Sequence, residues 1–209
     1  MIVSQRKVFF SLLLLLPLVS GCSAKRGSAH DTIRNKGSDT MVMLAQAWAE
    51  QYSTVESKMA VEVSGGGSGQ GIASLIKGSV DLANSSRNMK PAEAAAAKAN
   101  TGKDIKELVI GYDALAVFVH RDNPLSEISI QQLAGIYRDD GKLTEWTQLN
   151  SRLPSRRDRI IRVNRQSSSG TYEFFREHVL SKHDFKLGTL DMNGSKEVVE
   201  LIASTPGAI

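Results

Sequence analysis

Apolar and polar positions follow two spacings, that of strands and that of helices, from residue 32 onward. Short runs rich in β-branched and apolar residues predict strands at 32–36, 60–63, 80–83 and 160–163. Apolar residues three and four positions apart, together with helix start signals, predict helices at 41–52, 72–77, 91–99, 130–137, 171–180 and 195–203. Strand, small-residue loop and helix recur in that order, which indicates parallel α/β layers.

Two further local signals refine this pattern. Ser129 and Gln132 have the spacing of a capping box, which predicts that the helix 130–137 begins just after Ser129. Trp146 and Leu149 follow a charged turn and are expected to pack beneath it.

The longest apolar run outside the N-terminus lies at 108–120, with Gly111 inside it. Its composition predicts a long strand, and its length suggests a crossover between two lobes. We therefore expect a first lobe over residues 32–112 and a second lobe over residues 113–209.

The N-terminus has the layout of a secretory signal. Two basic residues precede the apolar run 8–19, which is too short to cross a bilayer as a helix. The stretch 18–22 resembles the bacterial lipobox, in which the cysteine becomes the first mature residue and carries lipid on its thiol. These features predict a lipoprotein signal peptide over residues 1–21 and lipidation of Cys22.

Residues 22–31 are mostly small and polar and are expected to form a tether between the anchor and the folded part. Cys22 is the only cysteine, so no internal disulfide is possible. The alternative is an ordinary secretory signal with an incidental cysteine. If Cys22 is lipidated, the protein is exported and lipid-anchored to a membrane, on its periplasmic face or at the outer surface.

The positive charge of the chain does not indicate a nucleic-acid-binding protein. The sequence pI is about 9.2 and the net charge is +4. Without the two basic residues of segment 1–21, 24 basic and 22 acidic residues remain. The basic residues near 152–162 are interpreted as a solvated loop and strand edge, so no nucleic-acid partner is expected.

Four loops share a small, hydroxyl-rich composition at or near a helix start after a strand. The first turn of a helix exposes unpaired N–H groups and carries a partial positive charge. Glycine and serine let an anion approach this backbone, and hydroxyls add uncharged donors. One such loop is weak support, but four together predict an anion site. They are Gly37–Thr40, Ser64–Gly71, Asn84–Arg87 and Arg165–Thr171.

Several catalytic and cofactor signatures are missing from the sequence. It has no P-loop, no dinucleotide fingerprint in register and no Gly-x-Ser-x-Gly elbow. Its four histidines are scattered and form no metal-ligand or nucleophile motif. We therefore expect no catalytic residue, no metal and no cofactor, and hence a protein that is not an enzyme.

At these loops the chain resembles the phosphate-binding (PstS-type) proteins of bacterial phosphate ABC transporters, over about residues 32–209. The marks of this resemblance are Gly-Ser-Asp-Thr-Met at 37–41, Ser-Gly-Gly-Gly-Ser-Gly-Gln-Gly at 64–71, Val-Asp-Leu-Ala-Asn-Ser-Ser-Arg at 80–87, Leu133 to Leu149, and Arg165 with Ser-Gly-Thr at 169–171.

The resemblance implies an α/β fold of the periplasmic-binding-protein type II class, with two lobes of mixed sheet flanked by helices. It also implies capture of inorganic phosphate between the lobes and delivery to the permease and ATPase subunits of an ABC transporter. A monomer is expected.

The resemblance carries over ten phosphate-binding residues. Arg165 would be the charged partner, and Ser169 to Thr171 would supply hydroxyl and N–H donors. The full set is Ser38, Asp39, Thr40, Ser68, Ser86, Arg87, Arg165, Ser169, Gly170 and Thr171.

Two departures from the family pattern affect these expectations. Better-known members carry an aspartate where Ser86 stands, and it accepts the proton of hydrogen phosphate. Asp39 could do that work from the opposite loop, or it could simply cap the following helix. Family chains also continue beyond Ile209, so a C-terminal truncation is expected.

Two competing functions remain open. The first is a binding protein or sensor for another oxyanion, such as molybdate, tungstate or sulfate. The second is an exported phosphatase, which would need a nucleophile, a metal cluster or a histidine acid–base pair.

Overall fold

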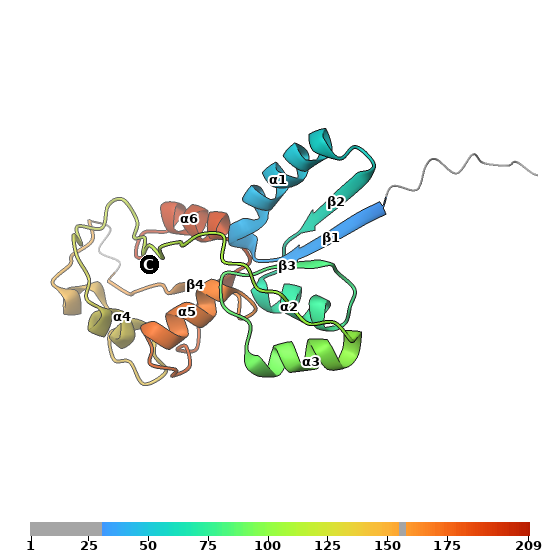
Figure 1. Ribbon diagram of the computed structural model, residues 1–209. Coiled ribbons are helices and arrows are strands. Elements are labelled where there is room, and N and C mark those ends of the chain that lie inside the picture. The colour runs from blue at the N-terminus through green and yellow to red at the C-terminus, as the bar shows by residue number, and fades with distance from the viewer. Residues whose placement is uncertain (1–30, 155–157) are drawn as a thin grey trace, which may run out of the picture.

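The computed structural model describes residues 31–154 and 158–209 (Figure 1). The predicted signal peptide 1–21 and Cys22 lie outside the described residues, and of the predicted tether only Asp31 is described. Among the helices of these two ranges, none combines the length and the apolar character that crossing a bilayer requires.

The first lobe is a three-stranded parallel sheet with helices on both of its sides (Figure 1). Helix α1 lies on one side of the sheet, and α2 and α3 lie on the other. The strands are β1 (Asp31–Gly37), β2 (Met59–Ser64) and β3 (Leu82–Asn84), in the spatial order β2-β1-β3. The helices are the 3-10 turn η1 (Asp39–Met41), α1 (Val42–Val55), α2 (Ser68–Ile76) and α3 (Pro91–Thr101).

The second lobe is built around a two-stranded parallel sheet and four helical segments. Its elements are α4 (Ile130–Tyr137), the 3-10 turn η2 (Trp146–Leu149), β4 (Val163–Arg165), α5 (Gly170–His178), β5 (Leu190–Met192) and α6 (Ser195–Ser204). Strand β4 starts at the last residue of the strand predicted at 160–163. Ile161 instead forms a single parallel bridge with Ala208.

The main hydrophobic core lies in the second lobe, around Trp146 and Ile136, which are both fully buried. Trp146 donates from Nε1 to the carbonyl of Gly207 at 3.0 Å, so this buried indole has its polar partner. The expected burial of Trp146 and Leu149 is confirmed. The predicted capping box is also confirmed, since Ser129 and Gln132 exchange hydrogen bonds of 2.8 and 3.1 Å.

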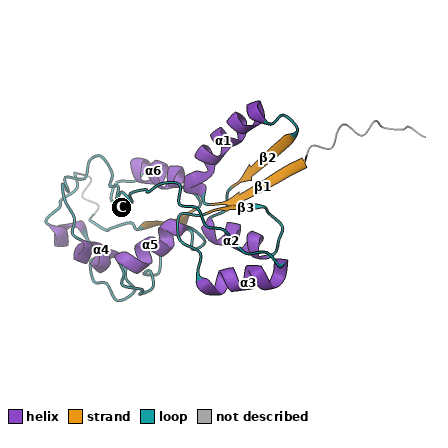
Figure 2. Ribbon diagram, viewed as in Figure 1, coloured by secondary structure: helices purple, strands orange, loops and turns teal. Residues whose placement is uncertain are grey.

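The strand predicted at 108–120 is wrong: the segment forms no ladder within the described residues and runs as a connector between the lobes (Figure 2). Tyr112 is 99% exposed and Leu108 is 69% exposed. A strand needs a neighbouring backbone with which to pair, and the apolar composition of a run does not show whether that neighbour exists. The segment does join the two lobes, as expected of a crossover.

Candidate anion-binding site

Three serines from separate loops of the first lobe meet at the carboxyl end of its sheet. Ser38 follows β1, Ser68 starts α2, and Ser86 follows β3. The Ser86 hydroxyl lies 3.2 Å from that of Ser38 and 3.1 Å from that of Ser68, and the Ser86 N–H donates to the Ser68 Oγ at 3.0 Å. Because β1 and β3 are parallel, their carboxyl ends bring these loops to one edge, where ligands of open α/β sheets commonly bind.

The start of α5, from the second lobe, fits against this serine cluster. A Cβ atom on Gly170 would lie 2.2 Å from the Ser86 Oγ and 2.9 Å from the Ser68 Oγ, so only glycine allows this close approach. Ser169 caps the helix, since its hydroxyl accepts from the N–H groups of Thr171 and Tyr172. The two lobes therefore touch at residues that were predicted from the sequence to bind an anion.

Arg165, at the end of β4, is the buried cation of the site, with only 5% of its side chain exposed. Its guanidinium donates to the Ser195 hydroxyl at 2.9 Å and to the Asn193 carbonyl at 2.8 Å, and it lies 3.3 Å from the Asp39 carboxylate. Its Nε is buried and has no hydrogen-bond partner among the described residues. Burial lowers the pKa of Arg165, and the nearby carboxylates of Asp39 and Glu197 oppose that shift.

Asp39 joins the two lobes through its carboxylate. It accepts from the Gly66 N–H of its own lobe at 2.7 Å, and from Arg165 and the Gln166 side-chain amide of the second lobe at 3.3 and 3.4 Å. Among the described residues its carboxylate accepts no hydrogen bond from the following helix, whose N-cap position is Ser38. In the structure Asp39 thus faces the cation of the site and remains partly open to solvent.

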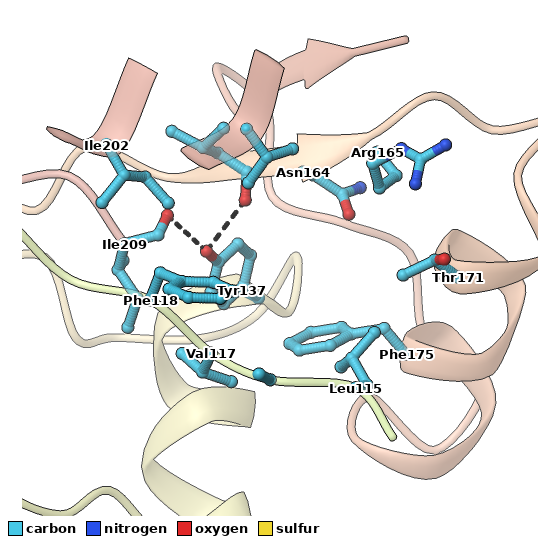
Figure 3. A pocket seen from close by; sticks show the side chains of 13 residues that line it. Leu115, Val117, Phe118, Tyr137, Asn164, Arg165, Thr171, Phe175, Ile202 and Ile209 are labelled. Carbon is cyan, nitrogen blue, oxygen red and sulfur yellow. Dashed lines mark hydrogen bonds between the residues drawn. The ribbon is translucent and has the colours of Figure 1, made fainter. Parts of the chain in front are cut away.

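Five of the predicted site residues line one cavity of about 330 Å³ between the lobes. Ser195, Val198 and Val199 of α6 also line it, and the connector contributes Asp113 together with apolar residues from 114 to 118. A smaller cavity of about 80 Å³ adjoins it, with Arg165 and Thr171 on one side and Leu115 and Phe118 nearby (Figure 3). The five predicted residues of the larger cavity are Thr40, Ser86, Arg165, Gly170 and Thr171. Ser38, Ser68 and Ser169 are buried and are not among the residues that line it.

Arg87 lies outside the cavity lining, and its guanidinium is engaged elsewhere. Its guanidinium makes two bonds to Glu93, of 2.9 and 2.8 Å, and an ion pair of 2.7 Å with Glu173, and it does not line the cavity. The hydrogen bonds to Glu93 raise its pKa. Its donors are thus committed to these two carboxylates and to the Asn88 carbonyl.

The sequence reasoning did not single out Gln166, Asn193 or Ser195, which all contact the same guanidinium–carboxylate pair. The signal was present for the last two, because Asn193-Gly194-Ser195 is a further small polar loop between a strand, β5, and a helix, α6. Gln166 carried no comparable signal beyond its place next to Arg165.

The geometry defines a two-lobed α/β fold whose cleft, within the described residues, holds the buried Arg165, several hydroxyls and the starts of helices. The chain belongs to the PBP superfamily, whose domain model matches residues 23–209.

Two relatives of the chain are named as phosphate-binding proteins. The phosphate-binding protein PstS of Pseudomonas aeruginosa is 29% identical over 193 residues, which cover 88% of this chain and 59% of that protein. PstS of Staphylococcus aureus is 32% identical over 168 residues, which cover 80% of this chain and 49% of that protein. The chain thus spans about half to three fifths of the length of these relatives.

Two crystal structures share the architecture. One is described as a phosphate ABC transporter substrate-binding protein of Clostridium perfringens with bound phosphate. It has a TM-score of 0.72 at 25% identity, and the match covers 85% of this chain and 68% of that one. An ABC-type phosphate transport receptor of Vibrio cholerae gives a TM-score of 0.62 at 26% identity, with 84% and 68% covered.

Proposed function

We propose that the protein captures inorganic phosphate in this cleft and delivers it to the permease and ATPase of a phosphate ABC transporter. The observation that carries the proposal is the buried Arg165, whose Nε lacks a partner among the described residues and which lies beside hydroxyl-bearing loops of both lobes. The names of the relatives and the phosphate bound to one structural neighbour support the choice of anion.

The buried guanidinium of Arg165, with its unpartnered Nε among the described residues, favours a small anion. Taking a guanidinium out of water is costly unless hydrogen-bond acceptors surround it. Arg165 has one carboxylate and two neutral acceptors within the described residues, so an oxyanion would complete its set. Bonds between ionised partners are roughly twice as strong as neutral ones. Thr40, Ser86 and Thr171 would add neutral donors.

Binding is proposed to occur by closure of the lobes. Phosphate would contact the first lobe through Ser38, Thr40 and Ser86, and the second through Arg165 and Thr171. An anion that bonds to both lobes at once selects the closed form, because only that form offers both sets of contacts.

Asp39 is proposed to give the site its preference for hydrogen phosphate. Its carboxylate lies 3.3 Å from Arg165 and is therefore near any anion that this cation holds. A carboxylate can accept a proton-bearing oxygen, but it repels sulfate, which has no proton to donate. Ser86, where better-known members have an acid, supplies no such acceptor charge.

We also propose that the protein is exported, is lipid-anchored through Cys22 and acts as a monomer without enzymatic activity. The export and the lipid anchor rest on the sequence pattern of residues 1–22. Labelling with radioactive palmitate should depend on Cys22 and disappear in Cys22→Ser.

Calorimetric titration of the whole protein tests the main proposal. Phosphate should bind, and sulfate, molybdate and tungstate should compete poorly. Preferential binding of one of these other anions would move the function to that oxyanion. Release of phosphate from a chromogenic ester would instead favour a phosphatase.

A further inference from the structure

The two lobes are also joined by a group of charged side chains outside the anion cavity. We call Arg87, Lys90, Glu93 and Glu173 the interlobe charge cluster. Glu173, on the first turn of α5, forms ion pairs of 2.7 Å with the Arg87 Nε and 2.5 Å with the Lys90 Nζ. Both partners belong to the first lobe, so both of these ion pairs cross the cleft.

The first-lobe half of the cluster is held together by contacts within its own lobe. Glu93 binds the Arg87 guanidinium through two hydrogen bonds and also accepts from the Lys90 N–H at 2.8 Å. Arg87 additionally donates to the Asn88 carbonyl at 2.9 Å. An arginine held in this way loses little further side-chain entropy when Glu173 arrives, which favours the ion pair.

The cluster is also shielded from solvent more than an ordinary surface pair. The side chain of Arg87 is 14% exposed and that of Glu173 is 34% exposed. Water and salt therefore weaken the Arg87–Glu173 attraction less than they weaken a pair between fully exposed groups. With two cations and two carboxylates, the cluster balances its own charge.

We propose that Glu173 is a positioning residue that holds the two lobes closed and so sets how fast a captured anion leaves. Glu173 lies three residues after Gly170, and the two cations that pair with its carboxylate belong to the opposite lobe. Breaking them removes attraction only in the closed form, because an open cleft separates α5 from Arg87 and Lys90. The effect on release rests on the proposed phosphate function, whereas the effect on closure does not.

Closure can be measured without any ligand by hydrogen exchange of the whole protein. The Gly69 N–H donates to the Ser168 carbonyl at 2.9 Å across the cleft, so its exchange reports opening. Glu173→Gln should speed this exchange about fivefold. The Ser38 N–H, which donates to the Asn84 carbonyl within the first lobe, should exchange unchanged.

A matched variant controls for the loss of a negative charge from α5. Glu177 lies on the same helix, and its one ion pair among the described residues is with Lys182 of the same lobe, at 3.7 Å. Glu177→Gln should leave the exchange of Gly69 unchanged. The side chain of Lys90 is 58% exposed, so the Lys90→Gln protein should fold normally. It should reproduce part of the effect of Glu173→Gln. Wild-type exchange of Gly69 in Glu173→Gln, or equal acceleration in Glu177→Gln, would overturn the proposal.

Stopped-flow measurements then test release. In Glu173→Gln the dissociation rate of phosphate should rise about fivefold at low salt, and the difference from wild type should shrink as salt screens the wild-type pairs. An unchanged dissociation rate would contradict the proposed role. If wild-type protein bound no phosphate, the proposed function would fail, and the exchange of Gly69 would still decide whether Glu173 controls closure.

Discussion

Replacing Arg165 by alanine should weaken phosphate binding more than any replacement of a single hydroxyl in the cleft. The change removes the only arginine that lines the described cavity and leaves the Asp39 carboxylate without its cation. Removing one partner of a buried, hydrogen-bonded ion pair typically costs about 3–5 kcal/mol. If that cost falls on the bound state, the Kd should rise roughly 100- to 4,000-fold.

Isothermal titration calorimetry of the whole protein measures this change, with urea unfolding as the test of fold. Arg165→Lys should fall between wild type and alanine, because lysine keeps the charge but loses the planar fork. By comparison, Thr171→Val should cost about 0.5–1.5 kcal/mol, the usual worth of one neutral hydrogen bond.

Arg162 offers a matched control for Arg165. It is similarly buried, on the segment that leads into β4, but it donates to the Leu187 carbonyl and the Thr189 hydroxyl, away from the cavity. Arg162→Ala should lower the free energy of unfolding and leave the phosphate affinity of the folded protein unchanged. A folded Arg165→Ala protein that binds within threefold of wild type, or an equal loss of affinity in both variants, would refute the reasoning.

Three further changes test other parts of the site. Gly170→Ala places a methyl group against Ser86 of the opposite lobe; calorimetry should show phosphate binding weaker by about 1–3 kcal/mol, with urea unfolding unchanged. Asp39→Asn should raise the affinity for sulfate relative to phosphate; unchanged sulfate rejection in competition titrations would count against its proposed role. The hydrogen bonds from Arg87 lower the pKa of Glu93 in the folded protein. The ionised Glu93 therefore stabilises the fold at pH values above its pKa in the unfolded chain, and this contribution disappears as the pH falls through its lower pKa in the folded protein. Between about pH 6 and about pH 3, Glu93→Gln should therefore lose less unfolding free energy than wild type; equal losses would exclude this pair as the cause.

Local chemistry made much of the second lobe predictable from the sequence. The capping box at Ser129 needs only two side chains three positions apart, and the structure contains it. Trp146 is large, apolar and flanked by polar residues, so its burial follows from its composition. Such features depend on near neighbours in the chain and are therefore visible in the order of residues.

Features that depend on distant parts of the chain were less visible. The run 108–120 has the composition of a strand, but it finds no backbone partner within the described residues. The sequence predicted a helix that begins at residue 72, but helix α2 begins at Ser68. The reason is that the glycines of this loop form the first turn of the helix. Gly71 lies there because a Cβ atom would come within 2.4 Å of the Lys36 carbonyl, a contact that only the folded lobe reveals.

The candidate site shows the same division. Loop composition identified residues that the structure brings to one cleft, since small hydroxyl-bearing loops at helix starts have a common physical use. It could not separate Arg165 from Arg87, because both follow strands beside serines. The difference lies in Glu93 and Glu173, which take up the donors of Arg87 through contacts made only after folding.

The most direct test of the central proposal is a crystal structure of the whole protein grown with phosphate. The anion should lie between the lobes, within hydrogen-bond distance of the Arg165 guanidinium, of Ser38 or Thr40 in the first lobe, and of Thr171 in the second. A phosphate bound elsewhere, or an Arg165 side chain turned to the outer surface away from these loops, would contradict it.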